Sequence, residues 1–237
     1  MLKIPLKHII LSLTFLLLSY VTSAQRVYIE SGFENAYFKD YVNNLGENTL
    51  DLSYPKSQQV FIETGVKFDL NLKRDRLWDQ NLNLFRFRTK IDVGFSYNNY
   101  KINTGFYGGK VSIPLTYNLT YVGVKTGVNF SILNHREFKL YIHGHLSYDL
   151  LVSGSSEYKN VVNNIYKDRS LDRTLLRYHR GLNAEYFISD ITSIYIKYNV
   201  ADSFKEKNKD TNIEEEYSLH TNAFSVGLLF NIEQLRF

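Results

Sequence analysis

Cysteine is absent from this chain of 237 residues, and proline, methionine and tryptophan are scarce, with 3, 1 and 1 copies. The lack of cysteine excludes disulfides, thiolate metal sites, a cysteine nucleophile and the lipidated cysteine of a lipoprotein. Charge of one sign is not in excess either. Without a predicted leader that contains Lys3 and Lys7, the 28 basic residues fall to 26 against 24 acidic ones, a net charge of +2. This balance gives no reason to expect a nucleic-acid partner.

Long apolar runs are also missing from the mature part of the chain. After residue 25 no stretch approaches the roughly twenty apolar residues that a membrane-spanning helix needs. Aromatic residues are abundant instead, with 19 Tyr and 16 Phe. Flat rings pack well on the pleated surface of a sheet, so this composition favours strands over helices. At this length we expect one all-β domain, or one domain with a tail.

The first 24 residues have the three parts of a secretory signal peptide. Lys3 and Lys7 make the start positive, residues 9–18 are almost wholly apolar, and the small residues Thr22 and Ala24 precede the expected cleavage site. An apolar run of about ten residues is too short for a membrane anchor. We therefore expect residues 1–24 to be removed and residues 25–237 to form the mature protein.

From residue 25 onward, apolar and polar residues alternate with period two over stretches longer than most soluble strands. A soluble sandwich would rarely sustain strands of twelve or more residues, whereas the wall of a membrane barrel needs them. The pattern predicts a transmembrane antiparallel β-barrel of about eight strands. The eight segments are Arg26–Glu34, Val60–Leu72, Phe85–Tyr97, Lys110–Leu133, Phe138–Val152, Arg173–Ile188, Ile191–Ala201 and Tyr217–Ile232.

The links between these segments alternate between long and short, as in bacterial barrels that have long extracellular loops and short periplasmic turns. The long polar links are 35–59, 98–109, 153–172 and 202–216. To keep the strand count even, we treat Lys110–Leu133 as one strand. We expect a β-bulge near Asn118–Thr120, where its apolar phase changes, and we place Pro114 in the part that projects beyond the membrane.

Aromatic residues on the lipid-facing parity are expected near both interfaces. Arg180 also falls on that parity, so either it snorkels toward the outer interface or a bulge shifts the phase of its strand. The expected outer girdle is Tyr97, Tyr148, Tyr178 and Tyr198, and the inner one is Phe85, Phe130, Tyr186 and Phe230.

The opposite parity places many charges of both signs inside the barrel. Eight strands enclose a lumen just wide enough for side chains to fill it. Paired charges that plug the lumen are therefore favoured over an open pore, because unpaired charges would be costly there. The inward residues are Glu30, Glu63, Lys67, Arg86, Arg88, Lys90, Asp92, Lys125, Lys139, His143, His145, Asp149, Arg177, His179, Glu185 and Lys197.

The last predicted strand, Ser-Val-Gly-Leu-Leu-Phe-Asn-Ile, resembles the closing-strand signal by which the outer-membrane assembly machinery recognises its barrels. The matching residues are Ser225, Gly227, Phe230 and Ile232, and the chain ends on Phe237, either as the usual terminal aromatic or as the end of a short tail. With Gly32, the Ser112–Leu115 run, Gly127 and Gly144, the chain resembles the outer-membrane β-barrel domain of Bacteroidota, the porin family or PorT-like proteins. The resemblance implies the architecture and no catalytic residue.

His145 and Ser147 are the most enzyme-like pair, because they project from one face of one strand, near the outer end that we expect for it. A His two residues before a Ser is similar to the arrangement in outer-membrane lipid A deacylases, in which His, Ser and an acidic residue form a nucleophilic site. Here Tyr148 follows the serine and the pair has inward parity, so we do not expect an enzyme. Binding of a metal by His143, His145 and His179 is also less expected than histidines satisfied by lumen carboxylates.

We therefore predict a non-enzymatic protein of the bacterial outer membrane, a plugged small barrel with surface loops for binding or envelope structure. The alternatives are a narrow porin-like channel for small solutes and a lipid A-modifying enzyme. We expect no cofactor and no nucleic acid. The expected partners are outer-membrane lipids, the barrel assembly machinery and a protein that contacts the extracellular loops, for which the aromatic segment 35–59 is the better candidate.

Overall fold

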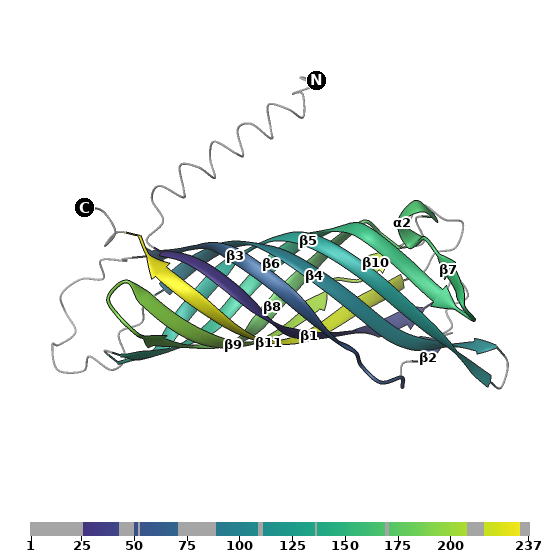
Figure 1. The fold of residues 1–237 in the computed structure, drawn as a ribbon, viewed down its shortest axis with the longest axis horizontal. Coiled ribbons are helices and arrows are strands. Elements are labelled where there is room, and N and C mark those ends of the chain that lie inside the picture. Colours follow the sequence, from purple (N-terminus) through teal and green to yellow (C-terminus); the bar gives the residue numbers. More distant parts are fainter. Residues whose placement is uncertain are drawn as a thin grey trace, which may run out of the picture.

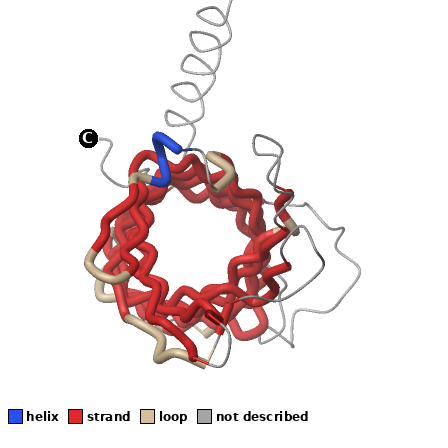
Figure 2. The backbone as a smooth tube through the Cα atoms, turned by 90° about the vertical axis from the view of Figure 1, so that its right-hand side faces the viewer, coloured by secondary structure: helices blue, strands red, loops and turns tan. Residues whose placement is uncertain are grey.

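Eight long antiparallel strands close into a barrel in the computed structural model, which describes residues 26–42, 50–51, 53–70, 89–108, 111–135, 137–168, 171–207 and 216–232. Each strand pairs with the next, and the first pairs with the last, so no edge of the wall is left open (Figures 1 and 2). These strands are β1 (Arg26–Val42), β3 (Gln58–Leu70), β4 (Thr89–Gly108), β5 (Val111–Asn134), β6 (Phe138–Tyr158), β8 (Thr174–Phe187), β9 (Thr192–Ser203) and β11 (Glu216–Asn231).

Three short strands and one helical turn lie at one end of the barrel. β2 (Leu50–Asp51) pairs with β4, β7 (Val161–Asn163) with β6, and β10 (Glu206–Lys207) with β11. The turn α2 (Ile165–Asp168) follows β7. We call this the distal end, and we call the end where β1 begins and β11 ends the proximal end (Figure 1). Within the described residues, no helix is long and apolar enough to cross a membrane.

The predicted all-β barrel of eight strands is confirmed, but several strands are longer than predicted. β1 continues from residue 35 to Val42, β4 runs on to Gly108, and β6 runs on to Tyr158. The predicted long links at 35–59, 98–109 and 153–172 are therefore partly wall, and the link between β4 and β5 shrinks to residues 109–110. The predicted signal peptide lies outside the described residues.

The prediction of a bulge in β5 near Asn118–Thr120 is wrong, because the extra residue at this level belongs to the neighbouring strand β6. β4 and β5 keep one continuous register from Thr89↔Phe130 to Gly108↔Val111. The register shifts instead between β5 and β6, where Thr120 pairs with Ser153 and Tyr121 with Leu151, so the extra residue is Val152 of β6. The apolar residues of β5 change phase because apolar side chains point inward in its distal part and outward in its proximal part.

The two faces of the wall exchange polarity along the barrel. On β4, the outward residues Ile91, Val93, Phe95 and Tyr97 are followed by Asn99, Lys101 and Asn103. On the inward face, Lys90, Asp92, Ser96 and Asn98 are followed by Tyr100 and Ile102. Lipid outside the proximal part requires an apolar exterior, which leaves the polar side chains to the interior. Beyond the lipid, the exterior faces water and the interior can hold a hydrophobic core. The barrel thus extends past the membrane as a wall with ordinary soluble patterning.

Exposed apolar side chains form the lipid-facing belt of the proximal part. Its distal edge includes Tyr97, Tyr148, Tyr178 and Tyr198, and its proximal edge includes Phe130, Tyr186 and Phe230, all of them exposed as predicted for two aromatic girdles. Phe85 of the predicted girdle lies outside the described residues. Pro114 is exposed on the distal part of β5, opposite Gly105 of β4.

Candidate functional site

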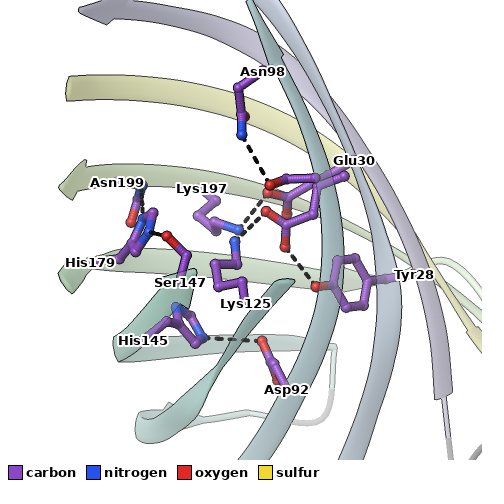
Figure 3. A network of polar contacts seen from close by, with 12 residues as sticks. Tyr28, Glu30, Asp92, Asn98, Lys125, His145, Ser147, His179, Lys197 and Asn199 are labelled. Atoms are coloured by element: carbon purple, nitrogen blue, oxygen red, sulfur yellow. Dashed lines mark hydrogen bonds and ion pairs between the residues drawn. The ribbon is translucent and has the colours of Figure 1, made fainter. Parts of the chain in front are cut away.

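The lumen of the proximal part is filled by a network of charged and polar side chains (Figure 3). Of the sixteen residues predicted to point inward, Lys139 is half-buried. Thirteen are buried inside the wall, namely Glu30, Glu63, Lys67, Lys90, Asp92, Lys125, His143, His145, Asp149, Arg177, His179, Glu185 and Lys197. Arg86 and Arg88 lie outside the described residues. Glu34, which sequence reasoning left at the end of its strand, is also buried inside because β1 is longer than predicted.

Ion pairs connect the carboxylates of this network to cations on other strands. Near the proximal end, Glu185 takes Arg26 at 2.9 Å and Lys90 at 3.1 Å, and accepts a hydrogen bond from Ser193 at 2.9 Å. Further along, Lys67 lies 3.6 Å from Asp92. Because each buried charge has an opposite partner within the lumen, the network offsets the cost of removing these groups from water.

Two tyrosines and two lysines fill the middle of the lumen. Tyr195 donates to Glu30 at 2.6 Å, and Lys197 contacts the other oxygen of the same carboxylate at 2.5 Å. In the same way Tyr28 donates to Glu63 at 2.6 Å, and Lys125 pairs with Glu63. Each carboxylate is thus held by one phenol and one ammonium group. Alternation predicts which residues point inward, but it does not predict these partners, because they depend on strand stagger across the lumen.

The glycine of the closing-strand motif has a local reason to be glycine. Gly227 faces the lumen, where the ring of Tyr195 lies so close that an added Cβ would fall 2.3 Å from a ring carbon. Ser225, two residues earlier, is also inward and buried, whereas Phe230 is outward in the belt. Ile232 follows the end of β11, and Phe237 lies outside the described residues.

The candidate nucleophile Ser147 is buried in the lumen, and its neighbours differ from those expected. Its hydroxyl lies 2.8 Å from Nε2 of His179 on β8, not beside His145. His145 instead faces Asp92, with Nε2 at 3.4 Å from the carboxylate. Since β6 extends to Tyr158, this stretch lies in the proximal and middle lumen rather than near the outer end of the strand.

A chain of hydrogen bonds passes through Ser147, from Asn199 by way of His179 to Asp149. The amide nitrogen of Asn199 lies 3.1 Å from Nδ1 of His179, so Nδ1 accepts and Nε2 carries the proton that is donated to Ser147. Ser147 in turn donates to Asp149 at 2.9 Å. A catalytic serine would donate its proton to the histidine instead. In this geometry the Ser147 hydroxyl donates to Asp149 and not to the histidine.

Arg177 marks the boundary between the charged lumen and the distal core. Its guanidinium contacts Asp149 at 2.7 Å and Glu34 at 3.7 Å, and donates to the hydroxyl of Tyr100 at 2.6 Å. Tyr100 belongs to the distal core, a buried cluster of apolar and aromatic residues. The cluster consists of Ala36, Phe38, Tyr41, Leu50, Tyr100, Ile102, Leu119, Tyr121, Leu151, Ile165, Leu171, Leu175, Tyr217 and Leu219.

Little free space remains among these side chains. A cavity of about 20 Å³ lies beside Glu30, Lys125 and Arg177, which is room for about one water molecule. No group of histidines and carboxylates in the described part of the chain has the geometry of a metal site. The lumen is therefore packed with side chains at its middle and, through the distal core, at its distal end.

No family model matches the sequence, and no curated protein matches it. Among solved structures, the chain is similar to Ail, the attachment invasion locus protein of Yersinia pestis, with 12% identity over 87% of this chain and 99% of that chain and a TM-score of 0.37. It is also similar to the outer membrane protease OmpT from Escherichia coli, with 10% identity, coverage of 88% and 97%, and a TM-score of 0.46.

The outer membrane protein OprG from Pseudomonas aeruginosa is similar at 9% identity, with coverage of 88% and 97% and a TM-score of 0.41. At such identities and TM-scores, these likenesses carry no argument about activity, and the architecture follows from the wall and lumen themselves. The chain has the fold of an outer-membrane β-barrel: a closed transmembrane antiparallel barrel of eight strands, apolar toward lipid and charged within.

Proposed function

We propose that this protein is a non-enzymatic integral protein of the bacterial outer membrane, a closed barrel that carries a rigid extension outside the cell and presents its distal loops to a partner or as part of the surface coat. The exchange of polarity along the wall is the observation that carries this proposal. A barrel that continues past the lipid belt with a packed core inside provides a stiff support for loops rather than a passage.

The orientation follows from the termini. In bacterial barrels both ends of the chain lie on the periplasmic side and the longer loops are extracellular. β1 begins and β11 ends at the proximal end, so the distal core, β7 and α2 belong outside the cell. Val161 and Val162 of β7 are 57% and 66% exposed there, which gives a protein partner apolar surface to bury.

The packing of the lumen supports a plugged barrel over the alternative of a narrow channel. The six carboxylates Glu30, Glu34, Glu63, Asp92, Asp149 and Glu185 all have cationic partners in the lumen. The distal core then covers this layer with apolar side chains, which solvate an ion poorly. Solutes would have to cross both layers.

The proposal also names the contacts that any such barrel makes. The belt contacts outer-membrane lipids, and the last strand with Ser225, Gly227 and Phe230 is what the assembly machinery would recognise. The same closing-strand motif supports membership in the porin or PorT-like family of Bacteroidota. The buried position of Ser147, together with its donation to Asp149, supports the absence of a lipid-modifying activity.

Single-channel conductance of the refolded protein in a planar bilayer tests this proposal. We expect no current steps from protein whose insertion is verified by protection of the wall against added protease. A variant in which residues 161–168 are replaced by a short Gly-Ser turn should insert equally well and stay silent, because these residues lie outside the ring of eight strands. Discrete, salt-dependent steps from the unaltered protein would contradict the plugged barrel and favour the channel.

A further inference from the structure

A cluster of charged residues lies on the outside of the wall, at the distal edge of the lipid-facing belt. Four neighbouring strands supply it, with Lys39 on β1, Arg180 on β8, Asp202 on β9 and His220 on β11. In the sheet register, Asp202 pairs with His220, and His220 pairs with Tyr37. Together with Tyr37 of β1 and Lys56, which lies just before β3, we call Lys39, Arg180, Asp202 and His220 the rim cluster.

The rim cluster starts inside the belt and ends beyond it. Arg180 has lipid-facing parity between the exposed apolar residues Tyr178 and Leu182. The register of β8 with β6 and β9 is unbroken, so no bulge turns Arg180 inward. Its Nη1 instead reaches Asp202 Oδ2 at 2.9 Å, which shows that the side chain snorkels in the distal direction.

Asp202 organises the basic side chains of the cluster. Besides Arg180, its carboxylate contacts Nδ1 of His220 at 2.6 Å and Nζ of Lys39 at 3.7 Å. The Asp202 side chain is only 4% exposed, whereas those of Arg180 and Lys39 are each 55% exposed. One covered carboxylate thus fixes cations whose outer faces remain open to the surroundings.

The formal charges of the rim cluster do not cancel, in contrast to those of the lumen. Lys56 adds a third cation above the ring of Tyr37, at 3.6 Å from its centroid, and that ring packs on His220 at 4.8 Å. Against three cations stand Asp202 and the neighbouring Asp40, which accepts a hydrogen bond from Ser218 at 3.3 Å. The cluster itself carries a net charge of +2 with His220 neutral, and the net charge is +1 when Asp40 is included; protonation of His220 raises either value by one.

We propose that the rim cluster binds the phosphate of an anionic glycolipid headgroup in the outer leaflet. This inference rests on the proposed function, which puts the distal edge of the belt at the outer headgroup layer. Arginine and lysine at this level attract lipid phosphates, and a guanidinium held by one carboxylate still presents donors on its outer side. The aromatic residues Tyr178 and Tyr37 flank the site, where an acyl chain meets its headgroup.

Lipid binding by the full chain in detergent micelles tests the proposal, with bis-phosphorylated lipid A as the probe and retained adducts counted by native mass spectrometry. The double variant Arg180→Gln/Lys39→Gln should weaken binding about tenfold. Lys101→Gln is the matched control, because Lys101 is exposed four residues beyond the girdle residue Tyr97, just as Asp202 lies four residues beyond Tyr198. Its binding should change less than twofold.

Two further probes separate the possible ligands. Lipid A without phosphates should bind about as weakly to the unaltered protein as the phosphorylated form binds to the double variant. Inorganic phosphate at the same concentration should not displace the lipid. Equal binding of both lipids, displacement by free phosphate, or an equal loss in Lys101→Gln would each overturn the lipid site. None of these results bears on membrane insertion, whose failure in a bilayer would instead overturn the proposed function.

Discussion

The proximal half of the barrel interior contains charged side chains, whereas the distal half contains apolar and aromatic ones. The proximal half holds buried ion pairs such as Lys197 with Glu30, whereas the distal half holds a core of Tyr, Leu and Phe side chains. Both halves are enclosed by the same strands in continuous register along β4 and β5. The medium outside the wall therefore determines which side chains fill the interior. Lipid outside leaves the charges for the interior, and water outside allows an apolar core.

Removal of the cation at the boundary between the halves should have the largest effect. Arg177→Met leaves Asp149 and Glu34 without their arginine partner in a closed lumen, so we expect the free energy of unfolding to fall by about 3–5 kcal/mol. Urea titration of the refolded barrel in micelles measures this loss. Arg180→Gln provides the control, because that exposed arginine should contribute less than about 1 kcal/mol. Equal losses in the two variants would contradict the view that interior charges contribute more to stability than exterior ones.

Truncation within the distal core should have the next largest effect. Leu175→Ala removes a fully buried side chain of that core and should destabilise the barrel by about 2–5 kcal/mol in the same titration. Its neighbour Leu176 points outward and is partly exposed, so Leu176→Ala should cost clearly less. If the two substitutions were equivalent, the distal interior would not be a packed core.

Steric crowding of the charged half should have a smaller effect. Gly227→Ala places a Cβ against the ring of Tyr195 and forces that ring to move while it is bonded to Glu30, so we expect a loss of about 1–3 kcal/mol. At Gly144, which is outward, an added Cβ meets nothing within 4 Å, and Gly144→Ala should be nearly neutral. A neutral Gly227→Ala would mean that the closing-strand glycine is not required by packing.

Period-two alternation predicted the strand count and the side of the wall on which the described lumen charges lie, because the direction of a side chain is a local property of a strand. It did not predict the inversion of polarity, since the rule that apolar residues face lipid holds only within the membrane. The signal was present in β4, where Tyr100 and Ile102 continue the parity of the inward Asp92 and Asn98. Interpreted as a phase change, the same inversion in β5 led to the incorrect bulge.

The partners within the lumen could not be predicted from the sequence at all. His145 and Ser147 share a face of β6, but the imidazole beside Ser147 belongs to His179, which lies on the neighbouring strand β8. Such contacts depend on the stagger between strands and on which rotamers fit across the lumen. Strand parity narrows the candidates to inward residues, and only the three-dimensional register selects among them.

Loss of the Ser147 hydroxyl should have the smallest effect on stability. It tests whether Ser147 acts only as a hydrogen-bonding group of the charged lumen. Ser147→Ala removes one donor to Asp149 and one acceptor for His179, but Arg177 still holds Asp149, so we expect a destabilisation of about 1 kcal/mol. Lipid A extracted from cells that produce the variant should have the same mass profile as lipid A from cells with the unaltered protein. A lipid A mass profile that changes in the Ser147→Ala variant would show that the charged lumen has a chemical role. A hydroxyl that only forms hydrogen bonds with neighbouring side chains cannot alter a lipid outside the wall.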